Sequence, residues 1–135
     1  MSGRFFLFGL GFSGRVIARA LMAAGWQVAG TTRSGEAADL PGVEVYAFDR
    51  DHPLPPGALA GVGAVLSAVP PDAHGDPVLD VAGAALRALP LRWAGYLSTT
   101  GVYGDRDGGW VTEESELRPT LDRSRRRVEA EAAWR

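Results

Sequence analysis

The sequence predicts a single α/β domain built on a doubly wound parallel sheet with helices on both faces. Two observations lead to this prediction. Apolar runs of strand length alternate with helix-forming segments along the 135 residues, the order typical of parallel α/β sheets. The first run, residues 4–8, is apolar throughout after Arg4, as expected of a strand that is buried on both faces.

Each element follows from a local pattern. Asp76 and Pro77 are typical of a helix N-cap and a first helical position, and Pro90 ends the helix that they begin. Gly25 stands where a glycine commonly follows a helix. Strands are expected at residues 4–8, 27–31, 43–48, 64–69 and 93–98, and helices at 13–24, at 77–89 and from 120 to the chain end, with a helical turn at 36–40.

Three glycines follow the first strand at the spacing GxGxxG, and a helix-forming segment begins at once. Gly9 allows a tight turn out of the strand, Gly11 has no side chain to keep a pyrophosphate from the backbone, and Gly14 lets the helix pack on the strand. The N terminus of that helix presents unpaired N–H groups and the positive end of its dipole. The alternative is a structural glycine-rich turn. The pattern favours a dinucleotide, with expected contacts at Gly9, Gly11, Phe12, Ser13 and Gly14.

The strand order follows from the same pattern. With the first strand central and a reversal of direction after the third, the order is 3-2-1-4-5, the arrangement of a Rossmann-type fold. Ligands of such sheets lie over the carboxyl ends of strands one and four. Ser67, Ala68 and Val69, at the end of strand four, are therefore expected to border the ribose on the nicotinamide side.

The end of the second strand bears on the choice of cofactor. Sites that prefer NAD place Asp or Glu about 20 residues after the glycines, to hold the ribose 2′-hydroxyl. Residues 31–34 read Thr-Thr-Arg-Ser and contain no carboxylate. Thr32, Arg33 and Ser34 suit a 2′-phosphate, which they would bind by charge-assisted hydrogen bonds. The sequence thus favours NADP over NAD, and the alternative is a solvated loop arginine.

Asp49 follows the third strand and has two interpretations. Its carboxylate either accepts a hydrogen bond from the adenine amino group or caps the segment that comes next. The sequence leaves these two open.

Composition excludes several classes of function. The net charge of −2 provides no basic field for nucleic acid or an anionic membrane. There is no cysteine, and His52 and His74 lie in proline-rich loops without ligand spacing, so no metal site is expected. The apolar run at the N terminus is too short for a signal peptide or a membrane span, which favours the cytoplasm.

Residues 97–104 read Leu-Ser-Thr-Thr-Gly-Val-Tyr-Gly and are followed by Glu113, Glu114 and Pro119. In this pattern the chain resembles the extended short-chain dehydrogenase/reductases, the NAD-dependent epimerase/dehydratase family, over almost its whole length. The resemblance implies a nicotinamide dinucleotide cofactor and nucleotide-sugar substrates. It also implies that Thr99 orients the substrate hydroxyl or carbonyl for hydride transfer.

The chain departs from this family at the Tyr-x-x-x-Lys pair, because Leu121 and Arg125 stand at the two positions. Leucine has no proton to exchange, whereas Arg125 keeps a positive charge near the ribose. Tyr103 is either a substitute acid or, as in the family, part of a turn. The resemblance is therefore to an atypical member.

Relatives continue into a sixth strand and a lobe that binds the substrate, so residues 1–135 are expected to be the NAD(P)-binding domain without that lobe. One hypothesis is an atypical nucleotide-sugar epimerase, dehydratase or reductase. A second is a sensor or regulatory protein that binds NADP without chemistry. A third ligand, S-adenosylmethionine or FAD, is disfavoured because those sites tend to keep an acid after strand two. The resemblance further implies a homodimer through helices 77–89 and 120–135, the second carrying Leu121, Val128 and Ala132 as an apolar stripe.

Overall fold

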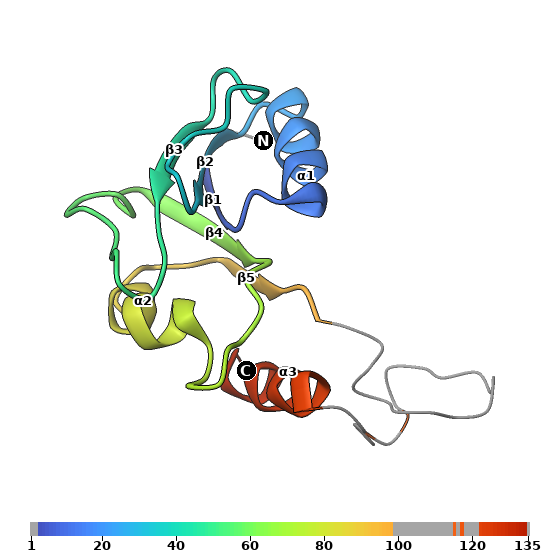
Figure 1. The fold of residues 1–135 in the computed structure, drawn as a ribbon. Coiled ribbons are helices and arrows are strands. Elements are labelled where there is room, and N and C mark those ends of the chain that lie inside the picture. The colour runs from blue at the N-terminus through green and yellow to red at the C-terminus, as the bar shows by residue number, and fades with distance from the viewer. Residues whose placement is uncertain (1–2, 99–114, 116, 118–121, 135) are drawn as a thin grey trace.

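The computed structural model describes residues 3–98, 115, 117 and 122–134 (Figure 1). Its strands are all parallel and lie in the order β3-β2-β1-β4-β5, which confirms the predicted topology. The elements in chain order are β1 (Arg4–Phe8), α1 (Phe12–Ala23), β2 (Gln27–Thr32), β3 (Glu44–Ala47), β4 (Val62–Ser67), α2 (Pro77–Arg87), β5 (Trp93–Tyr96) and α3 (Asp122–Trp134). No helix in the described part of the chain is long and apolar enough to cross a membrane.

The sheet is covered on both faces, and β1 divides the core between them. Phe6 and Phe8 are fully buried in a cluster with side chains of α2, whereas Phe5 and Leu7 belong to a second cluster with Ala18 of α1. This alternation is the period of two that a strand imposes on its side chains. Figure 1 shows α1 on one side of the sheet and α2 with α3 on the other. The apolar run of β1 thus has a helix to cover each of its faces.

Local hydrogen bonds set the ends of the helices. At the end of α1, Trp26 N–H donates to the Leu21 carbonyl and Gly25 N–H to the Met22 carbonyl, both at 3.0 Å. Gly25 adopts a φ of +94°, the left-handed conformation that this glycine cap requires. At the start of α2, Asp76 Oδ1 accepts hydrogen bonds from Val78 N at 2.9 Å and Leu79 N at 3.1 Å, as its N-cap pattern predicts.

The second oxygen of Asp76 fixes α3. Trp134 Nε1 donates to Asp76 Oδ2 at 2.7 Å, and the Trp134 ring stacks on Tyr96 of β5 with centroids 6.0 Å apart. One buried carboxylate therefore joins the start of α2 to the end of α3. Ala130, one turn before Trp134, is also buried. These contacts decide which face of α3 is turned toward the sheet.

Some element bounds differ from the sequence prediction. The helix expected at 77–89 ends at Arg87, because the residue before Pro90 is disfavoured in the helical conformation. The strand expected at 64–69 starts earlier and ends at Ser67, whose hydroxyl accepts a hydrogen bond from Val69 N. Residues 36–40 form a turn and not a helix, since Leu40 N donates to Ala37 O in a single i to i−3 bond. The helix expected from residue 120 begins at Asp122 in the described part of the chain, and residues 120 and 121 lie outside that part.

Candidate functional site

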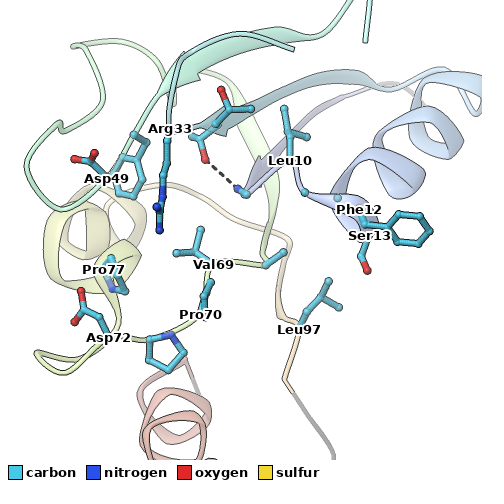
Figure 2. A pocket seen from close by; sticks show the side chains of 18 of the residues that line it. Leu10, Phe12, Ser13, Arg33, Asp49, Val69, Pro70, Asp72, Pro77 and Leu97 are labelled. Atoms are coloured by element: carbon cyan, nitrogen blue, oxygen red, sulfur yellow. Dashed lines mark hydrogen bonds between the residues drawn. The ribbon is translucent and has the colours of Figure 1, made fainter. Parts of the chain in front are cut away.

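The carboxyl ends of the five strands border a cleft of about 1000 Å³. It lies where the order of the strands reverses between β1 and β4, the place where open α/β sheets bind their ligands. Figure 2 shows side chains from opposite walls pointing into it. The lining comes from residues 9–15, 31–34, 36, 48–51, 68–72, 77, 97, 98 and 127.

The glycine turn after β1 is tied to β2 by a buried threonine. Gly9 N donates to Thr31 Oγ1 at 2.9 Å, and Leu10 N donates to Thr31 O at 2.8 Å. Gly9 adopts a φ of +94°, which a side chain would strain. Thr31 is 2% exposed, and sequence reasoning did not assign it a role at the site. Only the pairing of β1 with β2 reveals it, because nothing in the local sequence distinguishes it from Thr32.

Gly14 and Gly11 serve different purposes in this turn. A Cβ at Gly14 would lie 2.3 Å from the Gly9 carbonyl oxygen, so α1 packs on the turn as closely as a glycine allows. A Cβ at Gly11 would meet no atom within 4 Å in the part of the chain that the structure describes. Gly11 therefore leaves open space beside the backbone at the N terminus of α1.

Among the described residues, no side chain caps or neutralises the N terminus of α1. Gly11 is the N-cap and makes no side-chain capping bond, and the first turn holds no acidic residue. Ser13 is exposed beside it, while the Phe12 side chain is 88% exposed and lies on the far side of the turn from Arg33 (Figure 2). The open space and the uncapped N–H groups fit a phosphate group.

The loop after β2 is organised by Thr32. Its Oγ1 accepts hydrogen bonds from Gly35 N at 2.9 Å and Glu36 N at 3.0 Å, and Ser34 Oγ accepts from Glu36 N at 3.2 Å. These bonds bring Glu36 to the cleft, a carboxylate that the sequence analysis of residues 31–34 did not foresee. They also leave Arg33 exposed at the cleft.

Arg33 extends into the cleft toward Val69 (Figure 2). Among the described residues its guanidinium has no hydrogen-bond or ion-pair partner. Arg15, a neighbouring arginine of the cleft, differs in this respect, because its Nε is held by both oxygens of Asp39 at 3.0 and 3.2 Å. Arg33 is thus a cation available to an anionic ligand.

Arg50 closes the far wall of the cleft. Its Nε and Nη2 bind the two oxygens of Asp72 at 2.9 and 2.8 Å, and its Nη1 binds Asp80 of α2 at 2.7 Å. The hydrogen bonds from Arg50 lower the pKa of the Asp72 carboxyl to about 2. The same bonds raise the pKa of Arg50. This bridge joins the loop after β3 to the loop after β4.

Asp72→Asn is expected to lower the urea midpoint of unfolding at neutral pH. The folded pKa of about 2 lies below the ordinary value of 3.8, so the stabilisation is complete above pH 3.8 and is lost as the pH falls through about 2. The difference in urea midpoint between wild type and Asp72→Asn should therefore become smaller as the pH falls from 3.8 to about 2. Asp51→Asn removes an exposed carboxyl next to Arg50, in the loop after β3, and is the control that should leave the midpoint unchanged. A difference that stays constant down to pH 2 would contradict the assignment.

Asp49 takes part in a short turn. Its Oδ1 accepts a hydrogen bond from Asp51 N at 2.8 Å and lies 2.7 Å from His52 Nδ1. The hydrogen bond with His52 is the main reason that the pKa of Asp49 is lowered. Asp49 also lines the cleft, so its predicted contact with adenine remains a prediction.

The end of β4 places its three predicted residues differently. Ala68 and Val69 line the cleft. Ser67 is fully buried and is not part of the lining, because its hydroxyl accepts the Val69 N–H at 3.3 Å. Ser67 thus shapes the turn that presents Ala68 and Val69.

The end of β5 meets α3 at the cleft. Arg127 Nη1 donates to Leu97 O at 2.6 Å and to Tyr96 Oη at 3.3 Å, and Ser98 Oγ donates to Glu131 Oε2 at 2.6 Å. Leu97, Ser98 and Arg127 line the cleft. Burial, the largest effect, raises the pKa of Tyr96.

Four residues named from the sequence remain. Arg125, the predicted ribose contact, is exposed and is not part of the cleft lining. Thr99, Tyr103 and Leu121 lie outside the described residues, so their predicted roles remain predictions.

The topology, with a cleft at the carboxyl ends of the strands, defines a Rossmann-type α/β fold. Solved structures similar to this chain are NAD-dependent epimerase/dehydratase proteins and members of the short-chain dehydrogenase/reductase superfamily, and the chain corresponds to their N-terminal half. The family resemblance predicted from the sequence is thereby confirmed. The chain matches no protein-family model and no curated protein sequence.

Three solved structures, one of them of a protein of unknown function, illustrate the range of similarity. A conserved protein of unknown function from Silicibacter pomeroyi is 44% identical with a TM-score of 0.84, and the match covers 98% of this chain and 47% of that one. A Methylobacillus flagellatus protein provisionally assigned as an NAD-dependent epimerase/dehydratase is 27% identical with a TM-score of 0.77, covering 97% and 50%. UDP-glucuronic acid 4-epimerase from Bacillus cereus, solved with NAD, is 17% identical with a TM-score of 0.76, covering 96% and 50%. The chain thus spans about half the length of each.

Proposed function

We propose that this chain is the NAD(P)-binding part of an atypical nucleotide-sugar epimerase, dehydratase or reductase. The observation that carries the proposal is the open space at Gly11 beside the uncapped N terminus of α1. A pyrophosphate fits there, because the backbone N–H groups can bind it and no side chain of the described residues occupies the space. The similar Bacillus cereus epimerase, whose structure contains NAD, supports the same ligand class.

Each wall of the cleft has a role in this proposal. The glycine turn binds the pyrophosphate, Arg33 and Ser34 bind a 2′-phosphate on the adenosine ribose, and Ala68 and Val69 border the other ribose. Asp49 lines the same cleft, and its carboxylate would accept a hydrogen bond from the adenine amino group. The bound cofactor supplies hydride transfer at its nicotinamide ring, and Thr99 orients the substrate hydroxyl or carbonyl toward it.

NADP is the preferred cofactor in this proposal, and Arg33 supports that choice. Its guanidinium extends into the cleft and has no partner among the described residues. A hydrogen bond to a charged group contributes about 1.5–3 kcal/mol, so a phosphate contact with Arg33 corresponds to a preference of about 10-fold or more. Glu36 stands at the same wall and would reduce the preference by repelling the phosphate.

Calorimetric titration with NADP and NAD tests this preference. Wild type is expected to bind NADP about 10-fold more tightly, and Arg33→Ala should bind both cofactors with similar affinity. Arg92→Ala removes an exposed arginine outside the cleft and is the matched control, with the wild-type preference expected. Equal affinities of wild type for NADP and NAD would overturn the assignment of Arg33.

A second function, an NADP-binding sensor or regulatory protein without chemistry, is favoured by one feature of the sequence. Leu121 stands where the family has its catalytic tyrosine, and leucine exchanges no proton. The two functions share the cofactor site and differ in whether bound NADPH is ever oxidised. The hydride-transfer experiment in the Discussion separates them.

The chain is further proposed to form a homodimer through α2 and α3. In α2 Val81 is half-buried and Ala85 exposed, and in α3 Val128 is half-buried and Ala132 exposed. These side chains are available to a second copy, whereas the buried residues of both helices face the sheet. Sedimentation velocity at high micromolar concentration should show a dimer, and Ala132→Glu should shift it toward monomer. A wild-type monomer at that concentration would rule this assembly out.

A further inference from the structure

The helix α3 carries an arginine run, and one member of that run reaches the cleft. Of Arg125, Arg126 and Arg127, whose side chains the structure describes, only Arg127 contributes to the cleft lining. Arg125 is exposed elsewhere on the helix. Alignment with the family's Tyr-x-x-x-Lys pair predicts Arg125, and not Arg127, at the position of the lysine.

The rotation of α3 explains this difference. Ala130 is buried and Trp134 donates its Nε1 proton to Asp76, so these two residues mark the inward face of the helix. Arg127 precedes them by three and seven residues and therefore lies on the same face. Arg125 is two residues away from Arg127, about 200° around the helix, and points to the other side.

The guanidinium of Arg127 is held in place without being neutralised. It is half-buried, its Nη1 donates to Leu97 O at 2.6 Å and to Tyr96 Oη at 3.3 Å, and its central carbon lies 5.7 Å from the centroid of the Tyr96 ring. No carboxylate of the described residues forms an ion pair with it. Within residues 3–98, 115, 117 and 122–134, these bonds use only Nη1, so the donors on Nε and Nη2 are available to a ligand there.

Arg127 lies at one end of the cleft and Arg33 at the other. Arg33 follows β2, toward the β3 edge of the sheet, whereas Leu97 and Arg127 lie at the end of β5, the opposite edge. Figure 2 shows Val69 and Pro70 between Asp49 and Leu97. A dinucleotide that crosses the switch point has one nucleotide on each side of it. With the 2′-phosphate at Arg33, the nicotinamide nucleotide falls on the side of Arg127.

We propose that Arg127, and not Arg125, is the cation that binds the nicotinamide nucleotide, through its ribose hydroxyls and phosphate. This inference rests on the proposed dinucleotide function. It makes Arg127 a positioning residue, because it holds one half of the cofactor against the end of β5. It also explains how the site keeps a positive charge there although the lysine of the family is absent.

The test compares two ligands that share the adenosine half. NADP carries the nicotinamide nucleotide, whereas adenosine 2′,5′-bisphosphate keeps the 2′-phosphate and lacks that half. Calorimetric titration of the 135-residue chain with each ligand measures the two affinities. Arg127→Ala should lower the affinity for NADP about 10-fold or more and should change the affinity for the bisphosphate by less than about 2-fold. Arg127→Lys keeps the charge and should show the same selective loss at a smaller size, which serves if Arg127→Ala does not fold.

Arg126→Ala, a charge-matched change one residue away, is the control and should leave both ligands at wild-type affinity. An equal loss for both ligands, or no loss for NADP, would overturn the inference. If Arg125→Ala selectively lowers the affinity for NADP and the Arg127 variants do not, the inference is overturned in favour of Arg125. If wild type binds neither ligand, the proposed function itself fails, and that result is distinct from the other three.

Discussion

Gly11→Val is expected to weaken NADP binding by about 100-fold or more while the domain stays folded. A Cβ at Gly11 meets no atom of the described residues within 4 Å, so the new side chain occupies the space proposed for the pyrophosphate. The backbone tolerates the change, because Gly11 has a φ of −83° in the extended region. A valine there keeps the pyrophosphate from the backbone N–H groups, and the loss of two hydrogen bonds to a charged group, about 1.5 kcal/mol each, corresponds to about 100-fold. Calorimetry and thermal unfolding of the same sample would measure the two effects.

Gly14→Ala is the matched comparison within the same motif, because it should lower the stability of the fold, whereas Gly11→Val should lower the affinity for NADP. Its Cβ would lie 2.3 Å from the Gly9 carbonyl oxygen, so α1 must move away from the turn. Such overpacking costs about 1–3 kcal/mol in the free energy of unfolding. Gly11→Val, in contrast, should cost about 1 kcal/mol or less, the cost of a poor N-cap residue. Wild-type NADP affinity in Gly11→Val would contradict the pyrophosphate site.

The wild-type chain is expected to show no measurable hydride transfer from bound NADPH to sugar nucleotides. Leu121 cannot exchange a proton, and loss of a general acid or base costs about 10²–10⁴-fold in rate. Stopped-flow absorbance with UDP- and dTDP-sugars or their 4-keto forms would detect oxidation.

Rapid oxidation of NADPH by the 135-residue chain would contradict this expectation and would exclude the sensor function. Thr99→Val and Tyr103→Phe would then show which hydroxyl carries the proton, because each change removes one hydroxyl. A large loss of rate in Tyr103→Phe alone would assign the acid to Tyr103. A loss in Thr99→Val alone would favour a water held by Thr99.

The order of the sheet and the glycine turn were predictable from the sequence, because short patterns determine them. The unbroken apolar run of β1 indicated burial on both faces, and Phe5 and Phe6 do enter different cores. The N-cap of α2 at Asp76 and the glycine cap at Gly25 were predictable for the same reason, since each depends on residues within one turn.

The walls of the cleft depend on contacts between segments far apart in the chain. Thr31 supports the glycine turn only because β2 pairs with β1, and the bridge from Arg50 to Asp72 spans 22 residues. Glu36 reaches the cleft only because the hydroxyl of Thr32 folds the loop back. No local pattern carries this information: residues 31–34 contain no carboxylate, and Glu36 reaches the cleft only through the folded loop.

The clearest case is the arginine run of α3. By itself the sequence determined that a helix follows β5, and the resemblance to the family predicts Arg125 as the residue near the ribose. Which arginine faces the cleft is a matter of helix rotation, and a step of two residues turns a side chain by about 200°. Trp134, through its hydrogen bond to Asp76, fixes that rotation and brings Arg127 to the end of β5. The tertiary structure alone decided this residue, because the contact that orients the helix comes from 58 residues away in the chain.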